Sequence, residues 1–208
     1  MVHGHQRKCH SGTKTWVDTH NARNRRQNVT VHLIENIHYL YWNADITAFG
    51  PLRSIKGFPA HREVDGPIQF WLQYWKSCES KYPAAFDPSI VKTMIAVESS
   101  FKADARSRSS TATGLLQVTN SARRDLSGAK SRRGYRLVRN QIVSVEQTDL
   151  FDPLVNIAAA TRWLAVKVTT MPAGNLKNTF NLLKAYYDWS DKGAAYAEKV
   201  LRPYDQSQ

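Results

Sequence analysis

An apolar helical run that ends in a single carboxylate constrains this chain more than any other stretch. The run begins at Asp87-Pro88, a pair typical of a helix start, because Asp accepts hydrogen bonds from free backbone N–H groups and Pro fits the first turn. The apolar residues that follow fall mainly on one face of a helix: Ile90, Val91, Met94, Ile95 and Val97. The pattern predicts a core helix that carries Glu98 at its C-terminal end.

Glu98 stands at an unfavourable place for a carboxylate, because the C-terminal end of a helix is the negative end of its dipole. Its neighbours Val97 and Phe101 would keep water away, and desolvation raises the pKa of a carboxyl group. A carboxylic acid with a raised pKa can donate a proton near neutral pH. The alternative is an exposed Glu that only closes an amphipathic helix, which is the commoner role for this residue type.

Four motifs follow one another along the chain. They are Glu98-Ser99-Ser100-Phe101 with Ala105 and Gly114-Leu115-Leu116-Gln117, then 152–157 leading into 158–164, then 182–187, and last Tyr196–Val200. Their residue types and order resemble the lytic transglycosylase family with the goose-type-lysozyme-like fold, the SLT domain. The resemblance covers roughly Ile68–Leu201. Each motif alone is weak, but four in the right order are specific.

The resemblance implies a mainly α-helical, lysozyme-like domain that cleaves peptidoglycan glycan strands between N-acetylmuramic acid and N-acetylglucosamine. It implies that Glu98 protonates the glycosidic oxygen and then acts as a base towards the muramyl C6 hydroxyl, which gives a 1,6-anhydro end without water. The residues expected to bind or shape the sugar site are Gln117, Tyr186, Leu116 with the Gly114 backbone, and Thr113. Neither a cofactor nor a metal ion is expected.

The sequence departs from the family pattern at several positions. Leu116 replaces Met in the Gly-Leu-Met-Gln turn, a swap that conserves volume. Thr111 stands where the loop usually has Gly, and Asn120 and Ala122 replace Pro and Thr. Tyr187-Asp188-Trp189 replaces Asn-x-Gly, so sugar contacts on the product side are expected to be rebuilt. Tyr187 and Trp189 are expected in the core or at a rim rather than as a sugar platform.

A second carboxylate would change the reaction, because ordinary glycoside hydrolysis uses two acids. Between Glu98 and Gln117 the only other acid is Asp104. Paired with a water held by a nearby threonine, it would favour lysozyme-type hydrolysis. The threonines in question are Thr111, Thr113 and Thr119, and the more distant acids are Asp149, Asp152 and Asp188. Asp152 precedes a proline and is better explained as a helix N-cap.

The charge of the chain is +12, and most of it lies in one segment. Between Lys102 and Arg139 there are ten Lys or Arg residues against only Asp104 and Asp125. Such a run is usually a solvated surface, but it would also attract an anionic polymer towards Glu98. A wall polymer is favoured over nucleic acid, since no motif for base readout is present. A non-catalytic wall-binding or polyanion-binding module is the alternative from another class.

The sequence favours a division into an N-terminal extension, residues 1–62, and a lysozyme-like domain, residues 63–208. Residues 28–50 are rich in β-branched and aromatic side chains and predict two or three short strands, after a basic arm over Ser11–Arg26. A clustered His3, His5, Cys9 and His10 is expected to be incidental rather than a zinc site. Cys9 and Cys78 would form a disulfide only in an exported protein.

Four further helices are predicted, over Ile68–Tyr82, Pro153–Thr170, Leu176–Trp189 and Lys192–Leu201. The first carries a stripe of large apolar residues that is expected to pack in the core: Ile68, Trp71, Leu72 and Trp75. No apolar run reaches the length of a membrane span. The first ten residues have no apolar signal core. The expectation is therefore an enzyme of the periplasm or cell wall that a secretion system or a phage delivers, with a cognate immunity protein, or a fragment of a longer polypeptide.

Overall fold

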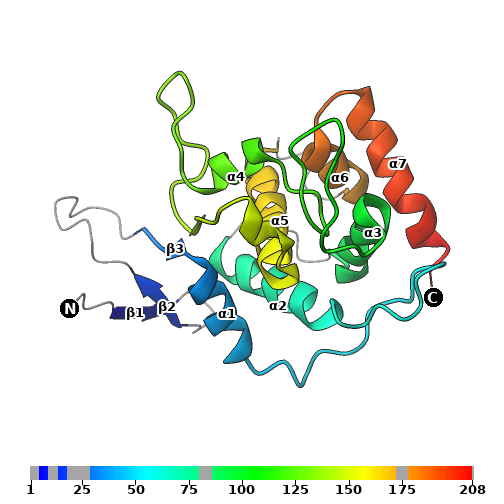
Figure 1. The fold of residues 1–208 in the computed structure, drawn as a ribbon, viewed down its shortest axis with the longest axis horizontal. Coiled ribbons are helices and arrows are strands. Elements are labelled where there is room, and N and C mark those ends of the chain that lie inside the picture. The colour runs from blue at the N-terminus through cyan, green and yellow to red at the C-terminus, as the bar shows by residue number, and fades with distance from the viewer. Residues whose placement is uncertain (1–4, 9–13, 18–28, 80–85, 172–177, 208) are drawn as a thin grey trace.

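The computed structural model of the chain describes residues 5–8, 14–17, 29–79, 86–171 and 178–207. This part of the chain forms seven α-helices, one short 3-10 helix and two two-stranded sheets. Helix α5 (Pro153–Thr170) lies at the centre and contacts α1, α2, α4 and α6, as Figure 1 shows. The mainly α-helical fold with short strands near the N-terminus confirms the fold class predicted from the sequence.

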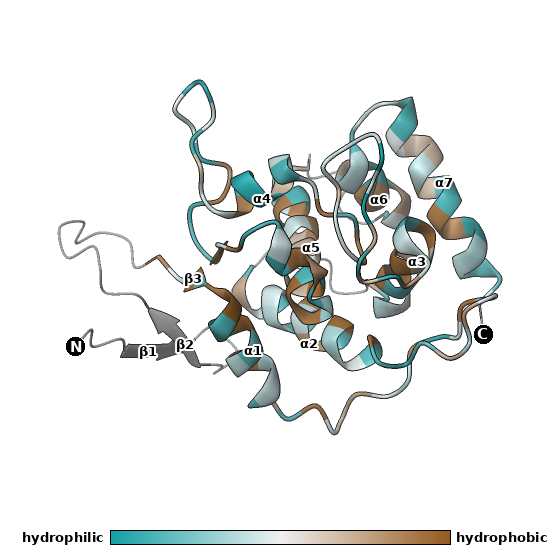
Figure 2. Ribbon diagram, viewed as in Figure 1, coloured by the Kyte–Doolittle hydropathy of each residue, from teal (hydrophilic) through white to brown (hydrophobic). Residues whose placement is uncertain are grey.

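The central helix begins where the sequence places it. The Asp152 side chain accepts hydrogen bonds from the backbone N–H groups of Leu154 and Val155, and Pro153 occupies the first turn. Its residues are buried along most of its length, and Figure 2 shows it as one of the more hydrophobic elements. The alanines at 158–160 are almost fully buried. A helix that is apolar on nearly all sides can serve as the core for several neighbours at once.

Helix α2 (Asp65–Cys78) packs against α5 through its aromatic stripe. Trp71 and Trp75 have no exposed surface, and the Trp75 indole N–H lies 3.2 Å from both Ala158 O and Thr161 Oγ1. The prediction that this stripe packs in the core is therefore confirmed. The helix ends at Cys78 rather than at Tyr82, although residues 80–82 lie outside the part that the structure describes.

Helix α3 (Pro88–Ser99) carries Glu98 in its last turn, as predicted. The Asp87 side chain caps its start by accepting a hydrogen bond of 2.8 Å from the Ser89 backbone N–H. The Lys92 ammonium of α3 forms a buried ion pair of 2.8 Å with Asp65 at the start of α2. A buried charge of this kind persists only with its partner, so the pair fixes α3 relative to α2.

The prediction of short strands over residues 28–50 is largely wrong. In the described part of this stretch, residues 29–50, only β3 (Val31–His32) is a strand, and it pairs in parallel with β4 (Ile142–Val143). The residues that follow form helix α1 (Ile34–Trp42), because Ile37, Leu40 and Tyr41 lie on one face and bury against the core. This packing outweighs the strand preference of β-branched and aromatic residues, which depends strongly on context.

Two more strands, β1 (His5–Lys8) and β2 (Lys14–Val17), form an antiparallel pair further towards the N-terminus. Helix α1 contacts α5 and shares one core with α2, so residues 34–42 pack against the part of the chain that follows residue 62. The division at residue 62 stays a prediction. The side chains of His3, His5, Cys9 and His10 lie outside the described part of the structure, and with them the Cys9–Cys78 pair.

The C-terminal helices α6 (Thr179–Tyr187) and α7 (Asp191–Asp205) form a tight hairpin. A Cβ atom on Gly193 would clash with the Asp188 carbonyl oxygen, so only glycine permits this approach of α7 to the end of α6. Helix α6 is shorter than predicted, whereas α7 continues to Asp205. None of the helices in the described ranges is long and apolar enough to cross a membrane.

Candidate active site

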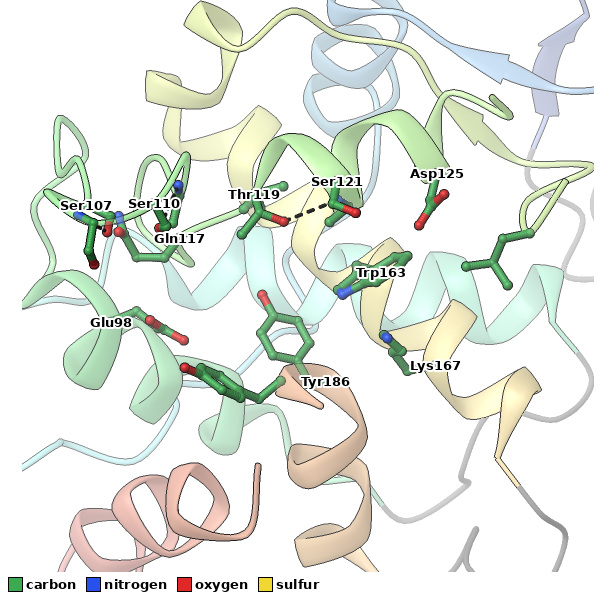
Figure 3. Close-up of a pocket in the computed structure, with 16 residues that line it drawn as sticks. Glu98, Ser107, Ser110, Gln117, Thr119, Ser121, Asp125, Trp163, Lys167 and Tyr186 are labelled. Atoms are coloured by element: carbon green, nitrogen blue, oxygen red, sulfur yellow. Dashed lines mark hydrogen bonds between the residues drawn. The ribbon is translucent and has the colours of Figure 1, made fainter. Parts of the chain in front are cut away.

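A cavity of about 620 Å³ opens between α3, α4, α5, α6 and the loop that joins α3 to α4. Helix α4 (Asn120–Leu126) forms one wall of it. Figure 3 shows Glu98 at one end, Asp125 and Lys167 at the other, and Tyr186 between them. The residues that line the cavity are Glu98, Ser107, Ser109, Ser110, Ala112, Gln117, Val118, Thr119, Ser121, Ala122, Asp125, Leu137, Trp163, Lys167, Tyr186 and Tyr187.

Glu98 is partly buried, and burial raises the pKa of its carboxyl group above the ordinary value of a Glu. The nearby Tyr196 hydroxyl and the charge of Lys199, both on α7, lower this pKa but do not cancel the effect of burial. The Tyr196 hydroxyl is buried and makes no hydrogen bond of normal geometry with any described residue. The direction and cause of the shift agree with the sequence-based expectation.

The backbone on both sides of the cavity adopts unusual conformations. Ser100 and Phe101, directly after α3, have φ angles of 53° and 62°, and Gln117 has a φ angle of 48°. Residues other than glycine rarely adopt positive φ, and such strain clusters at functional sites. Here the two left-handed residues end α3 immediately after Glu98, so the chain turns away and leaves the carboxyl group at the cavity wall.

The turn Gly114–Gln117 is held from below by Asn156 of α5. The Asn156 side chain accepts a hydrogen bond of 2.8 Å from Leu116 N–H and donates to Thr113 O at 3.0 Å and Leu150 O at 2.9 Å. Gly114 has a φ angle of 77°, and a Cβ there would clash with the Asn156 side chain and the Leu150 carbonyl oxygen. The turn therefore requires both the glycine and the buried amide beneath it.

Gln117, which the sequence predicts to bind the sugar, lines the cavity from this turn. Its amide nitrogen donates to Gly114 O at 2.8 Å and to Ala105 O at 3.2 Å, which fixes the side chain. Its amide oxygen has no donor among the described residues. That oxygen is consequently an acceptor available to a hydroxyl or N–H group of a bound sugar.

Tyr186 reaches the cavity from α6 while its ring packs in the core. Its hydroxyl donates a hydrogen bond of 3.1 Å to Leu116 O, and its ring stacks on Tyr196 with centroids 6.2 Å apart. Burial and the nearby Glu98 charge raise the pKa of the phenol, so it stays protonated. Tyr186 thus ties α6 to the turn that carries Gln117.

Two of the predicted sugar-site residues lie beneath the cavity rather than on its wall. Leu116 and Thr113 are almost fully buried and do not line the cavity. The Thr113 hydroxyl donates to Thr111 O and accepts from the Gln147 amide. The threonine that does line the cavity is Thr119, which also caps α4.

Asp104, the candidate second acid from the sequence, is exposed and does not line the cavity. The second carboxylate on the cavity wall is instead Asp125 of α4, which sequence reasoning did not single out. The pKa of Asp125 is raised by burial, although Lys167 and Arg124 act in the opposite direction. Its only signal in the sequence is that an acid interrupts a strongly basic segment.

Sequence reasoning also missed Trp163 and Lys167, which lie four residues apart on α5 and line the same end of the cavity as Asp125. Tyr187 lines the cavity and stacks on Tyr196, whereas Trp189 is 46% exposed and lies outside the lining. No group of three or more His, Cys, Asp or Glu side chains within the described ranges could hold a metal ion.

A family model described as "Transglycosylase SLT domain" matches residues 73–197, which is more than half of the chain. The matched residues include Glu98, the turn at Gly114–Gln117, Asn156 and Tyr186. No curated protein matches the sequence.

Proposed function

This chain belongs to the transglycosylase SLT family, and we propose that Glu98 is the acid and base with which it cleaves peptidoglycan between N-acetylmuramic acid and N-acetylglucosamine. Members of this family are peptidoglycan lytic transglycosylases, so the chain is a glycosidase-type enzyme of the cell wall polymer. One observation carries the residue assignment. Glu98 is a carboxyl group whose pKa is raised by burial, and it lies at the wall of a cavity large enough for a sugar ligand.

The first step of the proposed reaction is a proton transfer. Protonated Glu98 donates its proton to the glycosidic oxygen while the bond from that oxygen to the muramyl C1 breaks. The raised pKa keeps a larger fraction of Glu98 protonated near neutral pH than an exposed Glu would have. The Gln117 amide oxygen, held in place by its two amide hydrogen bonds, accepts from the sugar and positions it.

The second step closes the ring without water. The muramyl C6 hydroxyl attacks C1 as its proton passes to ionised Glu98, which restores the acid. The products are a 1,6-anhydromuramyl end and a free N-acetylglucosamine hydroxyl, so the proton is returned and no water is consumed. One carboxyl group suffices for both steps, because it acts first as an acid and then as a base.

Hydrolysis is the second candidate reaction, and Asp125 is the observation that favours it. It is a second carboxylate on the wall of the same cavity, whereas Asp104, the residue first considered for this role, is exposed. Figure 3 shows Glu98 and Asp125 at opposite ends of the labelled residues, with Tyr186 between them. This arrangement, with Tyr186 between the two carboxyl groups, disfavours a pair acting on one glycosidic bond, since hydrolases place both carboxylates beside the bond that they cleave.

Mass spectrometry of the products distinguishes these reactions. Purified peptidoglycan is incubated with the wild-type protein and with Glu98→Gln. We expect anhydromuramyl products from the wild type and none from the variant. Products heavier by one water, with reducing ends, would show hydrolysis instead. If the wild type released nothing, the protein would be a wall-binding module and the proposed reaction would be wrong.

The route to the wall is a separate proposal. We propose that the protein is an antibacterial effector or phage enzyme delivered to the wall, the effector form having a cognate immunity protein. The basic segment supports contact with an anionic wall, as many of its Lys and Arg side chains are exposed. Expression in a Gram-negative host should lyse cells when an added signal directs the protein to the periplasm, but not from the cytoplasm. Lysis that persists with Glu98→Gln would contradict an enzymatic cause.

A further inference from the structure

The end of the cavity away from Glu98 carries two opposite charges. Asp125 extends from α4 and Lys167 from the last part of α5, and both side chains line the cavity. Figure 3 shows both on the side of Tyr186 away from Glu98, with Trp163 between them. Groups at the end of the cavity opposite to Glu98 are placed to meet a substituent of the glycan rather than the bond that Glu98 would cleave.

The two charges are neighbours without being an ion pair. Lys167 lowers the pKa of Asp125, and Asp125 raises that of Lys167, so each group senses the charge of the other. Neither forms an ion pair with any described residue. For both groups, burial shifts the pKa more than the neighbouring charges do. The site therefore holds two partly desolvated charges whose hydrogen-bonding capacity is available to a ligand.

Trp163 fixes the cation at this end. The Lys167 ammonium lies 4.4 Å from the centroid of the Trp163 ring, one helical turn earlier on α5, which is the geometry of a cation–π contact. The face of the indole that meets Lys167 is thus occupied and cannot stack on a sugar. This end of the cavity therefore presents a cation that is held in place against the indole ring.

We propose that Asp125 and Lys167 form a subsite for a substituent that carries both an ammonium and a carboxylate group. Asp125 receives the ammonium group and Lys167 the carboxylate. A glycan backbone offers hydroxyl and acetamido groups and needs no opposite charges, while a simple polyanion would need only the cation. The stem peptide of peptidoglycan, where it contains a diamino acid, offers both groups. This assignment rests on the proposed function and deepens it.

Binding to the inactive Glu98→Gln protein tests the subsite without cleavage. Three soluble tetrasaccharides are titrated by calorimetry: one with tripeptide stems that end in a diamino acid, one with the stem amines acetylated, and one without peptides. We expect acetylation alone to weaken binding about tenfold, the usual effect of losing one charge-assisted hydrogen bond. Adding Asp125→Asn should weaken binding of the amine-bearing ligand by a similar factor and leave the acetylated ligand unaffected.

Adding Lys167→Met instead should weaken binding of both peptide-bearing ligands about tenfold. Neither change should alter binding of the peptide-free tetrasaccharide. Glu35→Gln and Lys56→Met are matched controls, because both residues are exposed and lie outside the cavity lining. These controls should leave all three affinities unchanged.

Two results would overturn the subsite. One is equal loss of affinity for all three ligands, which would make Asp125 and Lys167 glycan-binding or structural residues. The other is unchanged binding after acetylation and after both substitutions. The comparison of the amine-bearing with the acetylated ligand leaves Asp125 and Lys167 unchanged. Equal affinity for these two ligands would therefore count against the subsite even if a substituted protein failed to fold. Failure of the proposed function has a different signature, since wild-type protein would then release no products from peptidoglycan.

Discussion

Replacing Glu98 by Gln is expected to lower the rate of glycan cleavage by about two to four orders of magnitude, the range that general acid–base catalysis contributes. The amide has the shape of the acid but cannot donate a proton to the glycosidic oxygen. The rate is measured as the release of soluble fragments from purified peptidoglycan. Binding of the variant to the same material should remain close to that of the wild type. A variant that still cleaves at more than a tenth of the wild-type rate would exclude Glu98 as the acid.

The same substitution should make the fold more stable at neutral pH. The pKa of Glu98 is raised in the folded protein, so the group stabilises the fold only while it is protonated. That contribution is complete below the pKa of the unfolded chain and is lost as the pH rises through the folded-state pKa. Gln does not ionise, so the variant does not lose this stability as the pH rises. Its melting temperature should match that of the wild type at about pH 4 and exceed it at about pH 7.5.

Opposite behaviour would show that the carboxylate is stabilised rather than desolvated. A variant less stable than wild type at about pH 7.5 would mean that Tyr196 and Lys199 outweigh the cost of burial at Glu98. The control is Glu35→Gln, an exposed residue of α1, for which no such difference between the two pH values is expected. A gain in stability together with a loss of cleavage is typical of a site kept strained for its chemistry.

Local signals in the sequence were sufficient for the helices that carry the site. Asp87-Pro88 and Asp152-Pro153 cap α3 and α5 as predicted, because an N-cap interaction involves only residues within one turn. Helix α1 was mistaken for strands since its residue types favour strands, and only the packing of Ile37, Leu40 and Tyr41 on the core makes it a helix. That packing depends on partners on α2, such as Phe70, and on α5, which lies more than a hundred residues away.

The composition of the cavity wall depends on tertiary structure in the same way. Glu98 and Gln117 were recognised because their motifs are local, whereas Asp125, Trp163 and Lys167 belong to helices that meet only in the fold. Tyr196 has no special sequence context, yet its hydroxyl is the polar group that meets the Glu98 carboxyl group. Leu116 and Thr113 stand in the recognised motif but face the interior. A motif thus identifies the turn, but not which of its side chains reach the cavity.

Replacing Asn156 by Leu is expected to cost about 3–5 kcal/mol of folding free energy, an exceptional loss for one substitution. Leu has a similar volume, but it would leave two buried backbone groups without partners, Leu116 N–H and Leu150 O, and would remove one of the two hydrogen bonds that Thr113 O accepts. The loss is measured by urea unfolding. Gln73→Leu is the control, because Gln73 of α2 is exposed, and it should change stability by no more than about 0.5 kcal/mol.

The activity of the Asn156→Leu protein, measured in the cold where it is still folded, tests whether the turn positions the site. Without the amide beneath it, the turn can shift, and with it Gln117 and the Leu116 carbonyl oxygen that accepts from Tyr186. A displacement of about 1 Å at a catalytic site costs about a hundredfold in rate. We therefore expect cleavage to fall well beyond the unfolded fraction. If the rate followed only the folded fraction, Asn156 would support the fold alone, and the placement of Gln117 would have to depend on its own hydrogen bonds to Ala105 and Gly114.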